Sequence, residues 1–466
     1  MSRIENDFLG DRELGDDCYY GVQTLRGKDN FHITEMPMSQ EPFFVIAFAY
    51  VKKAAALANK ELGTIPADVA DALVWACDEL IAGKHRDQFV TDWLQGGAGT
   101  STNMNCNEVI CNLAAEKLGS VKGDYKRVSP NDHANFGQST NDAYPTALHL
   151  ALLLRSNVLL KAVEDLVGSF YGKAEEFKGV LKMGRTHLQD AVPMTLGQEF
   201  HGWGFTINDE VKVIREAQEH LKIVNLGATA IGTTVTAHPD YPALAVKKLA
   251  ELTGIDFVNS EDLIAATSDC GAYVALSSAI KSLSVKLTKV CNDLRLLASG
   301  PRCGLSEINL PQLQPGSSIM PGKVNPVIPE VTNQSCFLAI GLDTTVMLAA
   351  SAGQLELNVM EPVITFALFT SMKVMTNACN SLRTKCVDGI TANAERTAQM
   401  VMNSCGIVTL LKPHLGYKVC SEMAKECYHT GKALHQVVVE ERKLLTQQEW
   451  DATFNLENLI NPKFVQ

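Results

Sequence analysis

The 466-residue sequence lacks several features that define whole classes of protein. Its 41 Lys and Arg are outnumbered by 52 Asp and Glu, and no basic tract is present that could neutralise a nucleic-acid backbone. Its 13 Cys, an odd number, include no C-x-x-C pair, which argues against a disulfide framework and against a zinc site. We therefore expect no nucleic-acid partner, no metal and no cofactor.

Signals for export and for membrane insertion are also missing from the sequence. The opening residues "MSRIENDFLGDREL" are charged from the third position and contain no apolar stretch, and their acidic residues argue against a transit peptide. No uninterrupted apolar run approaches the ~20 residues of a membrane span. The sequence predicts a soluble, cytoplasmic protein with no membrane partner.

Long segments with a helical apolar period dominate what is present. In residues 272–298 the apolar positions alternate spacings of four and three, as in a helix packed nearly parallel to its neighbours. Comparable segments cover residues 144–178, 193–224, 326–352 and 358–387. Because they carry apolar residues on more than one face, one chain cannot bury them all, and we expect a homo-oligomer.

The pattern of segments predicts a mainly α fold with three domains. Residues 1–140 are mixed and rich in loops, residues 141–395 carry the long-helix bundle, and residues 396–466 contain shorter helical signals.

Four polar stretches interrupt this helical background. They are "GGAGTSTNMN" (96–105), "NFGQSTND" (135–142), "GRTHLQDAVP" (184–193) and "QPGSSIMPGKVNP" (314–326). Taken singly, the first two suit hydroxyl-capped helix starts, and a lone His187 in the third is more often structural than catalytic. A flexible connector explains the Gly and Pro of the fourth stretch, but not its Ser317-Ser318 pair and Lys323.

Together the four stretches indicate an anion site. They supply hydroxyl, amide and ammonium donors, and no acidic cluster accompanies them. In a chain with a formal net charge of −11, local donors and helix N-termini must provide the attraction for an anion. The pattern favours a pocket for a carboxylate or a phosphate.

The segment "GSSIMPGKVNP" resembles the signature loop of the aspartase/fumarase superfamily, and "GAGTSTNMNCNE", "GQSTNDAYPTAL" and "GRTHLQDAVPMTLGQEF" resemble its other shared regions in the same order. The flanking sequences "VIPEVTNQSCF" and "GQLELNVMEPVI" are similar to the aspartase branch rather than to class II fumarases. The resemblance implies reversible deamination of L-aspartate to fumarate and ammonia, through an enediolate, in a homotetramer whose active sites are shared between subunits. A class II fumarate hydratase, a lyase of larger succinyl substrates and a non-catalytic structural relative are the alternatives.

The resemblance also assigns roles to residues. It places the catalytic base on Ser317, on a loop that would close as a lid, and leaves open whether His187, facing Glu330, transfers a proton. The β-carboxylate would be held by Thr100, Ser139, Thr140 and Ser318, the α-carboxylate by Lys323 and Asn325, and the amino group by Asn141, Thr186 and His187.

Overall fold

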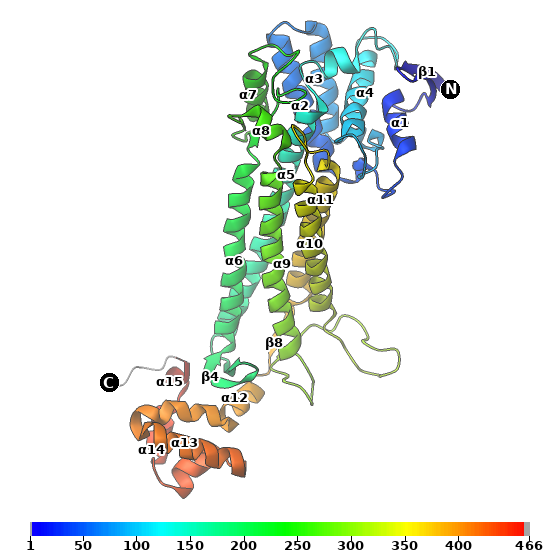
Figure 1. Cartoon of the computed structure of the whole chain (residues 1–466). Coiled ribbons are helices and arrows are strands. Elements are labelled where there is room, and N and C mark those ends of the chain that lie inside the picture. Colours follow the sequence, from blue (N-terminus) through cyan, green and yellow to red (C-terminus); the bar gives the residue numbers. More distant parts are fainter. Residues whose placement is uncertain (1, 461–466) are drawn as a thin grey trace. The chain divides into compact units, whose positions relative to one another are not determined.

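The computed structural model describes residues 2–460, and the predicted mainly α fold is confirmed (Figure 1). The residues group into two compact units. The first unit comprises Met1–Leu160, Lys212–Ser284 and Phe337–Met375, and the second comprises Lys161–Val211, Val285–Cys336 and Thr376–Gln466. The three domains expected from the sequence stay a prediction.

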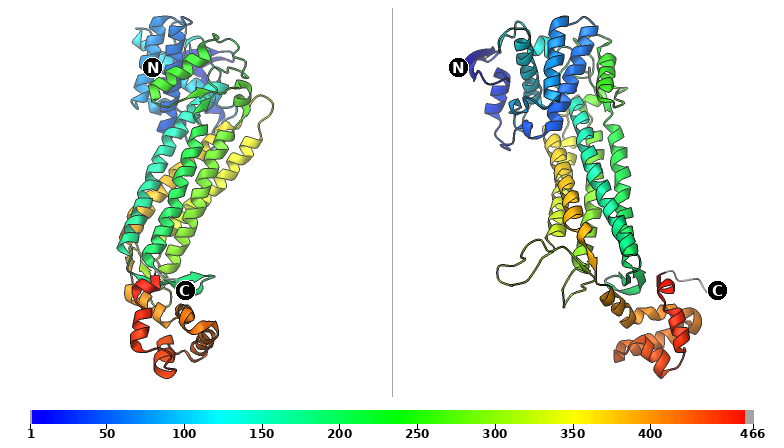
Figure 2. Two further views of the ribbon diagram at one scale, coloured as in Figure 1. Left: turned by 90° about the vertical axis from the view of Figure 1, so that its left-hand side faces the viewer. Right: turned by 180° about the vertical axis from the view of Figure 1, so that it is seen from behind.

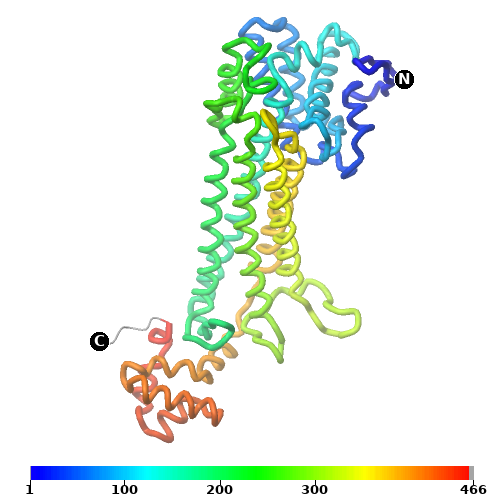
Figure 3. The backbone as a smooth tube through the Cα atoms, viewed as in Figure 1, coloured from blue at the N-terminus to red at the C-terminus, as the bar shows by residue number. Residues whose placement is uncertain are grey.

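Five long helices have residues in both units, and their paths along the chain can be followed in Figures 2 and 3. They are α5 (Thr140–Glu176), α6 (Leu196–His220), α9 (Gly271–Leu297), α10 (Val327–Ser351) and α11 (Glu361–Lys385). All five begin and end within four residues of the predicted segments. The helix α6 starts three residues late, because residues 189–195 form a strand in place of the first expected helical turn.

The first unit surrounds the starts of α5 and α11. Its other helices are α1 (Val22–Asn30), α2 (Pro42–Glu61), α3 (Ala67–Ile81), α4 (Thr100–Lys117), α7 (Tyr241–Thr253) and α8 (Leu263–Ser268). Strands β1 (Ser2–Asp7) and β2 (Gly10–Gly15) are antiparallel, and β5 (Ile223–Val224) and β6 (Val258–Asn259) are parallel. Its core includes the rings of Phe44, Phe48 and Tyr144, which contact one another in tilted and edge-to-face arrangements.

The second unit contains a hairpin, a small sheet and the C-terminal helices. The hairpin pairs β3 (Leu181–Thr186) with β4 (Gln189–Thr195), and the sheet pairs β7 (Ile308–Asn309) with β8 (Thr391–Ala392). The helices are α12 (Ala394–Asn403), α13 (Lys412–Thr430), α14 (Gln447–Thr453) and α15 (Leu456–Ile460). Val401, Ile407, Met423 and Trp450 form part of their apolar core.

Short segments of 3₁₀ or π helix complete the secondary structure. They are Met38–Gln40, Arg86–Gln88, Pro130–Ala134, Val387–Gly389, Cys405–Leu411 and Gln436–Glu441.

The prediction that no apolar segment approaches the length of a membrane span was wrong. By length and composition alone, α2, α5 and α10 are long and apolar enough to cross a membrane. In α2 and α5, 67% of the apolar window is buried inside the structure, as in core helices, whereas in α10 only 22% is buried. The helix α10 therefore presents apolar surface that the chain itself does not cover.

Candidate functional site

The residues predicted from the sequence lie on both compact units, and each group is described within its own unit. Thr100, Ser139, Thr140 and Asn141 belong to the first unit. The second unit carries Thr186, His187, Ser317, Ser318, Lys323, Asn325 and Glu330.

Thr100 occupies the exposed first position of α4, and its Oγ1 donates to the carbonyl of Gly97 at 2.7 Å. The preceding residue must be glycine for two reasons. Gly99 has a φ of +90°, and a Cβ there would lie 2.2 Å from the ring of Tyr144. This close approach packs the start of α4 against α5.

Ser139 directly precedes α5, whose first turn carries Thr140 and Asn141, and Asp142 in the same turn holds these residues in place. The carboxylate of Asp142 accepts hydrogen bonds from the backbone N–H of Ser139 (3.0 Å), Gly227 (3.0 Å) and Thr229 (2.9 Å). Burial raises the pKa of Asp142 to about 7, against the opposing effect of these donors. The three predicted side chains are thereby fixed on one rigid turn.

A buried network of amide side chains holds Thr140 through hydrogen bonds. Asn103 Nδ2 donates to Thr140 Oγ1 (3.2 Å) and to Asn135 Oδ1 (3.1 Å), and the ammonium of Lys52 donates to Asn135 Oδ1 (3.1 Å) and Gln138 Oε1 (2.9 Å). Lys52 is 1% exposed, and burial lowers its pKa to about 8. The sequence analysis missed these residues, although a lysine pair inside the apolar run "AYVKKAAALA" was a visible signal.

Thr186 and His187 stand exposed at the tip of the β3–β4 hairpin. His187 and Leu188 form its two-residue turn with φ values of 54° and 60°, a conformation that favours Asn-Gly over His-Leu. Backbone strain of this kind at a non-glycine pair is a feature of functional sites.

Buried charges fix the base of this hairpin. Arg185 Nη1 lies 2.5 Å from Glu307 Oε1, and Lys182 Nζ lies 3.2 Å from Glu307 Oε2. The side chains of Lys182 and Glu307 are 2% and 1% exposed. Because removing one member of a buried ion pair leaves an uncompensated charge, this cluster locks the strand that ends in Thr186.

The stretch 314–326 forms a loop whose two ends are joined. Gly316 N–H donates to the carbonyl of Lys323 at 2.6 Å, and Asn325 Nδ2 donates to the carbonyl of Gly316 at 2.7 Å. A Cβ at Gly316 would lie 2.7 Å from the Lys323 carbonyl oxygen, so this closure requires glycine. The helix α10 then begins at Val327, as the nearby Pro326 predicts.

The loop brings Ser317 and Lys323 to one cavity of about 430 Å³. Ser317 Oγ accepts hydrogen bonds from the backbone N–H of Ile319 (3.2 Å) and Met320 (3.0 Å). Ser318 is exposed and does not line this cavity.

Glu330 lies in the first turn of α10, and no hydrogen bond or ion pair joins it to His187 within residues 2–460 of one chain. Across the same residues, no cluster of three or more His, Cys, Asp or Glu side chains is placed to hold a metal ion. The predicted side chains offer hydroxyl, amide, imidazole and ammonium groups, which suit the binding of carboxylates.

Comparison with known proteins identifies the family. Residues 10–341 match the lyase family and residues 407–461 match the fumarase C C-terminus family. The aspartate ammonia-lyase of Escherichia coli is 56% identical over 99% of this chain and 97% of its own length. The aspartate ammonia-lyase of Helicobacter pylori is 53% identical over 99% of this chain and 98% of its own length.

Solved structures agree with the sequence relatives. The fumarate lyase:delta crystallin from Brucella melitensis bound to cobalt superposes with a TM-score of 0.95 at 46% identity, covering 98% of this chain and 99% of that one. The class II fumarase from Schistosoma mansoni superposes with a TM-score of 0.93 at 34% identity, covering 99% of this chain and 100% of that one. The chain therefore belongs to the aspartase/fumarase superfamily of lyases, and its aspartate ammonia-lyase relatives match it over nearly its full length.

Proposed function

We propose that this chain is an aspartate ammonia-lyase that converts L-aspartate reversibly to fumarate and ammonia. The identity of more than half of all positions to aspartate ammonia-lyases, over nearly the whole chain, supports this activity. The flanking sequences "VIPEVTNQSCF" and "GQLELNVMEPVI" favour it over the class II fumarase reaction.

The chemistry requires a proton to leave Cβ next to the β-carboxylate, which is a weak carbon acid. Negative charge accumulates on that carboxylate as an enediolate before the C–N bond breaks. Donors from Thr100, Ser139, Thr140 and Ser318 would stabilise this charge. A single preorganised donor of this kind contributes ~3 to 4 kcal/mol in comparable sites.

The remaining residues would orient the substrate. Lys323 and Asn325 would hold the α-carboxylate, and Asn141, Thr186 and His187 would surround the amino group. Anchoring both carboxylates fixes the Cβ–H bond relative to the base and aligns the leaving nitrogen. His187 would position the amino group, with Glu330 supporting it.

The main structural support for this mechanism is the set of groups that surround the Ser317 side chain. Two backbone N–H groups already donate to its Oγ, and Lys323 lines the same cavity. Hydrogen bonds and positive charge that favour an ionised group lower its pKa, so this loop is suited to generating a serine alkoxide. Ser317 would then take the Cβ proton when the loop closes over the substrate.

We propose a homotetramer in the cytoplasm, with each active site built from more than one subunit. The support is the outer face of α10, where Phe337 (57%), Leu338 (47%), Met347 (53%) and Leu348 (61%) are exposed. Phe337 and Leu348 lie about three helical turns apart and share one face of α10, and Leu338 and Met347 flank that face on either side, so the exposed residues form one broad apolar stripe. A second copy of the chain would bury it.

Replacing Ser317 tests the mechanism directly. The Ser317→Ala enzyme should keep its assembly and lose ~10²- to 10⁴-fold in kcat for L-aspartate, followed by ultraviolet absorbance of fumarate. The exposed Ser351→Ala on α10 serves as the matched control. Near-native turnover by Ser317→Ala would rule out this base. Faster formation of fumarate from L-malate than from L-aspartate by the unaltered enzyme would assign it as a fumarase instead.

A further inference from the structure

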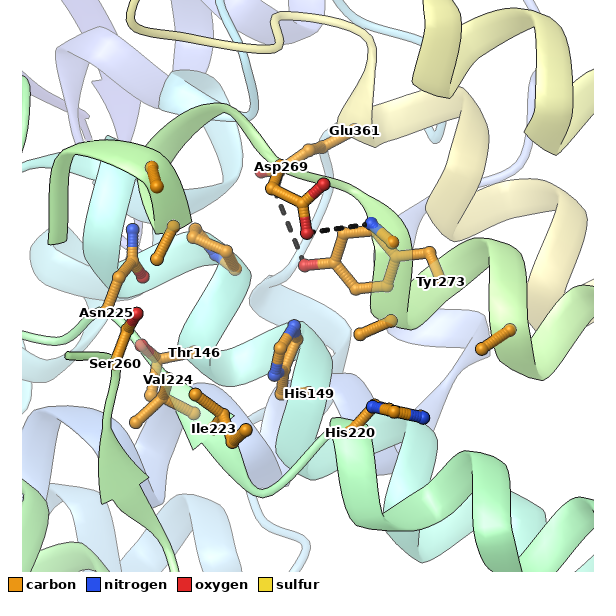
Figure 4. Close-up of a pocket in the computed structure, with 16 residues that line it drawn as sticks. Thr146, His149, His220, Ile223, Val224, Asn225, Ser260, Asp269, Tyr273 and Glu361 are labelled. Carbon is orange, nitrogen blue, oxygen red and sulfur yellow. Dashed lines mark hydrogen bonds between the residues drawn. The ribbon is translucent and has the colours of Figure 1, made fainter. Parts of the chain in front are cut away.

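A second cavity, of about 470 Å³, lies in the first unit and shares no residue with the predicted substrate site. Residues of α5, α9, β5 and the start of α11 line it (Figure 4). Its volume falls within the ~300 to 1,000 Å³ of small-molecule sites.

The carboxyl group of Glu361 is the most unusual feature of this cavity. Glu361 is 7% exposed, and within the described residues its side chain has one hydrogen bond, from Tyr273 Oη at 3.5 Å, and no ion pair. Its place as the first residue of α11 gives partial compensation from the helix N-terminus. Burial raises the pKa of Glu361 to about 8, so the side chain holds a proton near neutral pH, and a bound cation would favour its carboxylate form.

Among the other ionisable groups of the cavity are an exposed imidazole, His220, and the groups of Asp269 and His149. Asp269 lines it and adds a second carboxylate. His149 is neutral, because burial lowers its pKa to about 4, and its Nδ1 lies 3.0 Å from the carbonyl oxygen of Leu221. No Lys or Arg is among the residues that line the cavity. The rings of His149 and Tyr273 meet edge to face at 5.1 Å and form an aromatic wall beside the two carboxylates.

Another part of the cavity is polar and neutral. Thr146 is fully buried, and its Oγ1 has no hydrogen-bond partner among residues 2–460. Figure 4 shows Thr146 beside Ser260 and Asn225, which also line the cavity. A buried hydroxyl without a protein partner can hydrogen-bond to a group that enters the cavity.

We propose that this cavity binds a small organic ammonium ion that carries a hydroxyl group. Its ammonium group contacts Glu361 and Asp269, and its hydroxyl group hydrogen-bonds to Thr146. A zwitterionic amino acid fits less well, because its carboxylate would find no Lys or Arg side chain here. A metal ion fits less well, because no third acidic or imidazole side chain is placed to join the two carboxylates as a ligand in the part of the chain that the structure describes.

The cavity is physically connected to the predicted substrate turn. Asn225, which lines the cavity, donates from Nδ2 to the carbonyl of Asn141 at 3.0 Å. Binding of a ligand in the cavity would therefore shift Asn225 and, through this hydrogen bond, Asn141. This makes the cavity a candidate regulatory site. The binding itself does not depend on the proposed reaction.

Calorimetry on the full-length chain tests the proposal with ethanolamine as the probe, in phosphate buffer free of other amines. We expect saturable binding of ethanolamine and at least ~tenfold weaker binding of ethylene glycol and glycine, which lack the required net charge. Glu361→Gln preserves the shape of the side chain and should weaken ethanolamine binding at least ~tenfold. Thermal melting shows whether the variant is folded.

Two further variants keep the proposal testable if Glu361→Gln does not fold. Asp269→Asn should weaken binding ~threefold, and Thr146→Val should weaken it by a similar factor through loss of one hydrogen bond. Lys247→Gln, which removes an exposed charge of the same unit outside the cavity, is the control and should leave binding unchanged. Absence of saturable binding to the unaltered chain, equal binding of ethylene glycol, or unchanged affinity in folded cavity variants would each overturn the proposal.

Discussion

Individual buried ionisable side chains make the folding of this protein depend on pH, and Glu361 gives the clearest case. Burial raises its pKa from the ordinary 4.5 to about 8. The folded state then holds the proton more tightly than the unfolded state. Its stabilising contribution is fully present below pH ~4.5 and is lost as pH rises through about 8. The groups facing it, Tyr273, Cys270 and Tyr144, have pKa values raised above their ordinary range and do not titrate in this window.

The prediction is that Glu361→Gln removes this pH dependence. Between pH 5 and 8, the unaltered chain should lose stability by a few kcal/mol more than the variant does. Melting temperatures at intervals across this range, in buffers without amines, provide the measurement. The exposed Glu175→Gln is the control and should follow the unaltered chain. Parallel melting curves for Glu361→Gln and the unaltered chain would contradict the prediction.

At the residue scale, sequence alone identified side chains that belong to polar motifs but not those that support them. Ser317 and Lys323 stood out because a short loop brings together hydroxyl, ammonium, Gly and Pro, and the structure places both at one cavity. Lys52 and Glu307 could not be found in this way. They act through partners more than 80 residues away in the chain, which no local pattern reveals.

At the scale of elements, the β3–β4 hairpin depends on one buried carboxylate. Glu307 faces both Lys182 and Arg185, so Glu307→Gln leaves two cations with less compensation. We expect a loss of ~3 to 5 kcal/mol in the stability of the second unit. Urea unfolding followed by tryptophan fluorescence measures it. Glu176→Gln, which breaks an ion pair whose carboxylate is 51% exposed, should change the midpoint little. A Glu307→Gln midpoint equal to that of this control would show that the cluster is not needed.

The closed ends of the loop give a second prediction about an element. A methyl group at Gly316 would displace the Lys323 carbonyl, so Gly316→Ala should disturb the hydrogen bonds that join the ends of the loop. In the proposed reaction we expect kcat/KM to fall at least ~tenfold while melting stays unchanged. Gly172→Ala on α5, where nothing lies within 4 Å of the new methyl group, should retain full activity and gain slightly in stability. Full activity of Gly316→Ala would show that the hydrogen bonds joining the ends of the loop are not needed for the reaction.

The sequence predicted the helices, whose apolar periodicity is visible locally, but not the hairpin, whose formation depends on pairing between two strands. The long helices were predicted because their apolar spacing is visible over 25 or more residues. The hairpin was missed because Thr186 and Gln189 pair across the strained His187-Leu188 turn, which carries no Gly or Asn. Because β4 extends to Thr195 in this hairpin, α6 begins at Leu196 and not at the predicted residue 193.

At the scale of the whole molecule, we expect the apolar stripe on α10 to form an interface of the proposed homotetramer. Leu348→Asp places a charge at one end of this stripe, and we expect it to dissociate the proposed tetramer, because an unpaired charge buried in an interface costs several kcal/mol. Size-exclusion chromatography with light scattering measures the mass. Tyr428→Glu, at an 81% exposed position of α13, is the control and should remain assembled. A Leu348→Asp tetramer of unchanged mass would place the interface elsewhere.

The distribution of the predicted catalytic side chains over two units has a genetic consequence. If each reaction centre takes the Thr140 turn from one copy and the Ser317 loop from another, then two inactive versions, Ser317→Ala and Thr140→Val, can repair each other in mixed assemblies. Random mixing in equal amounts would restore about a quarter of the centres. Two alleles that are each defective could thus support growth together.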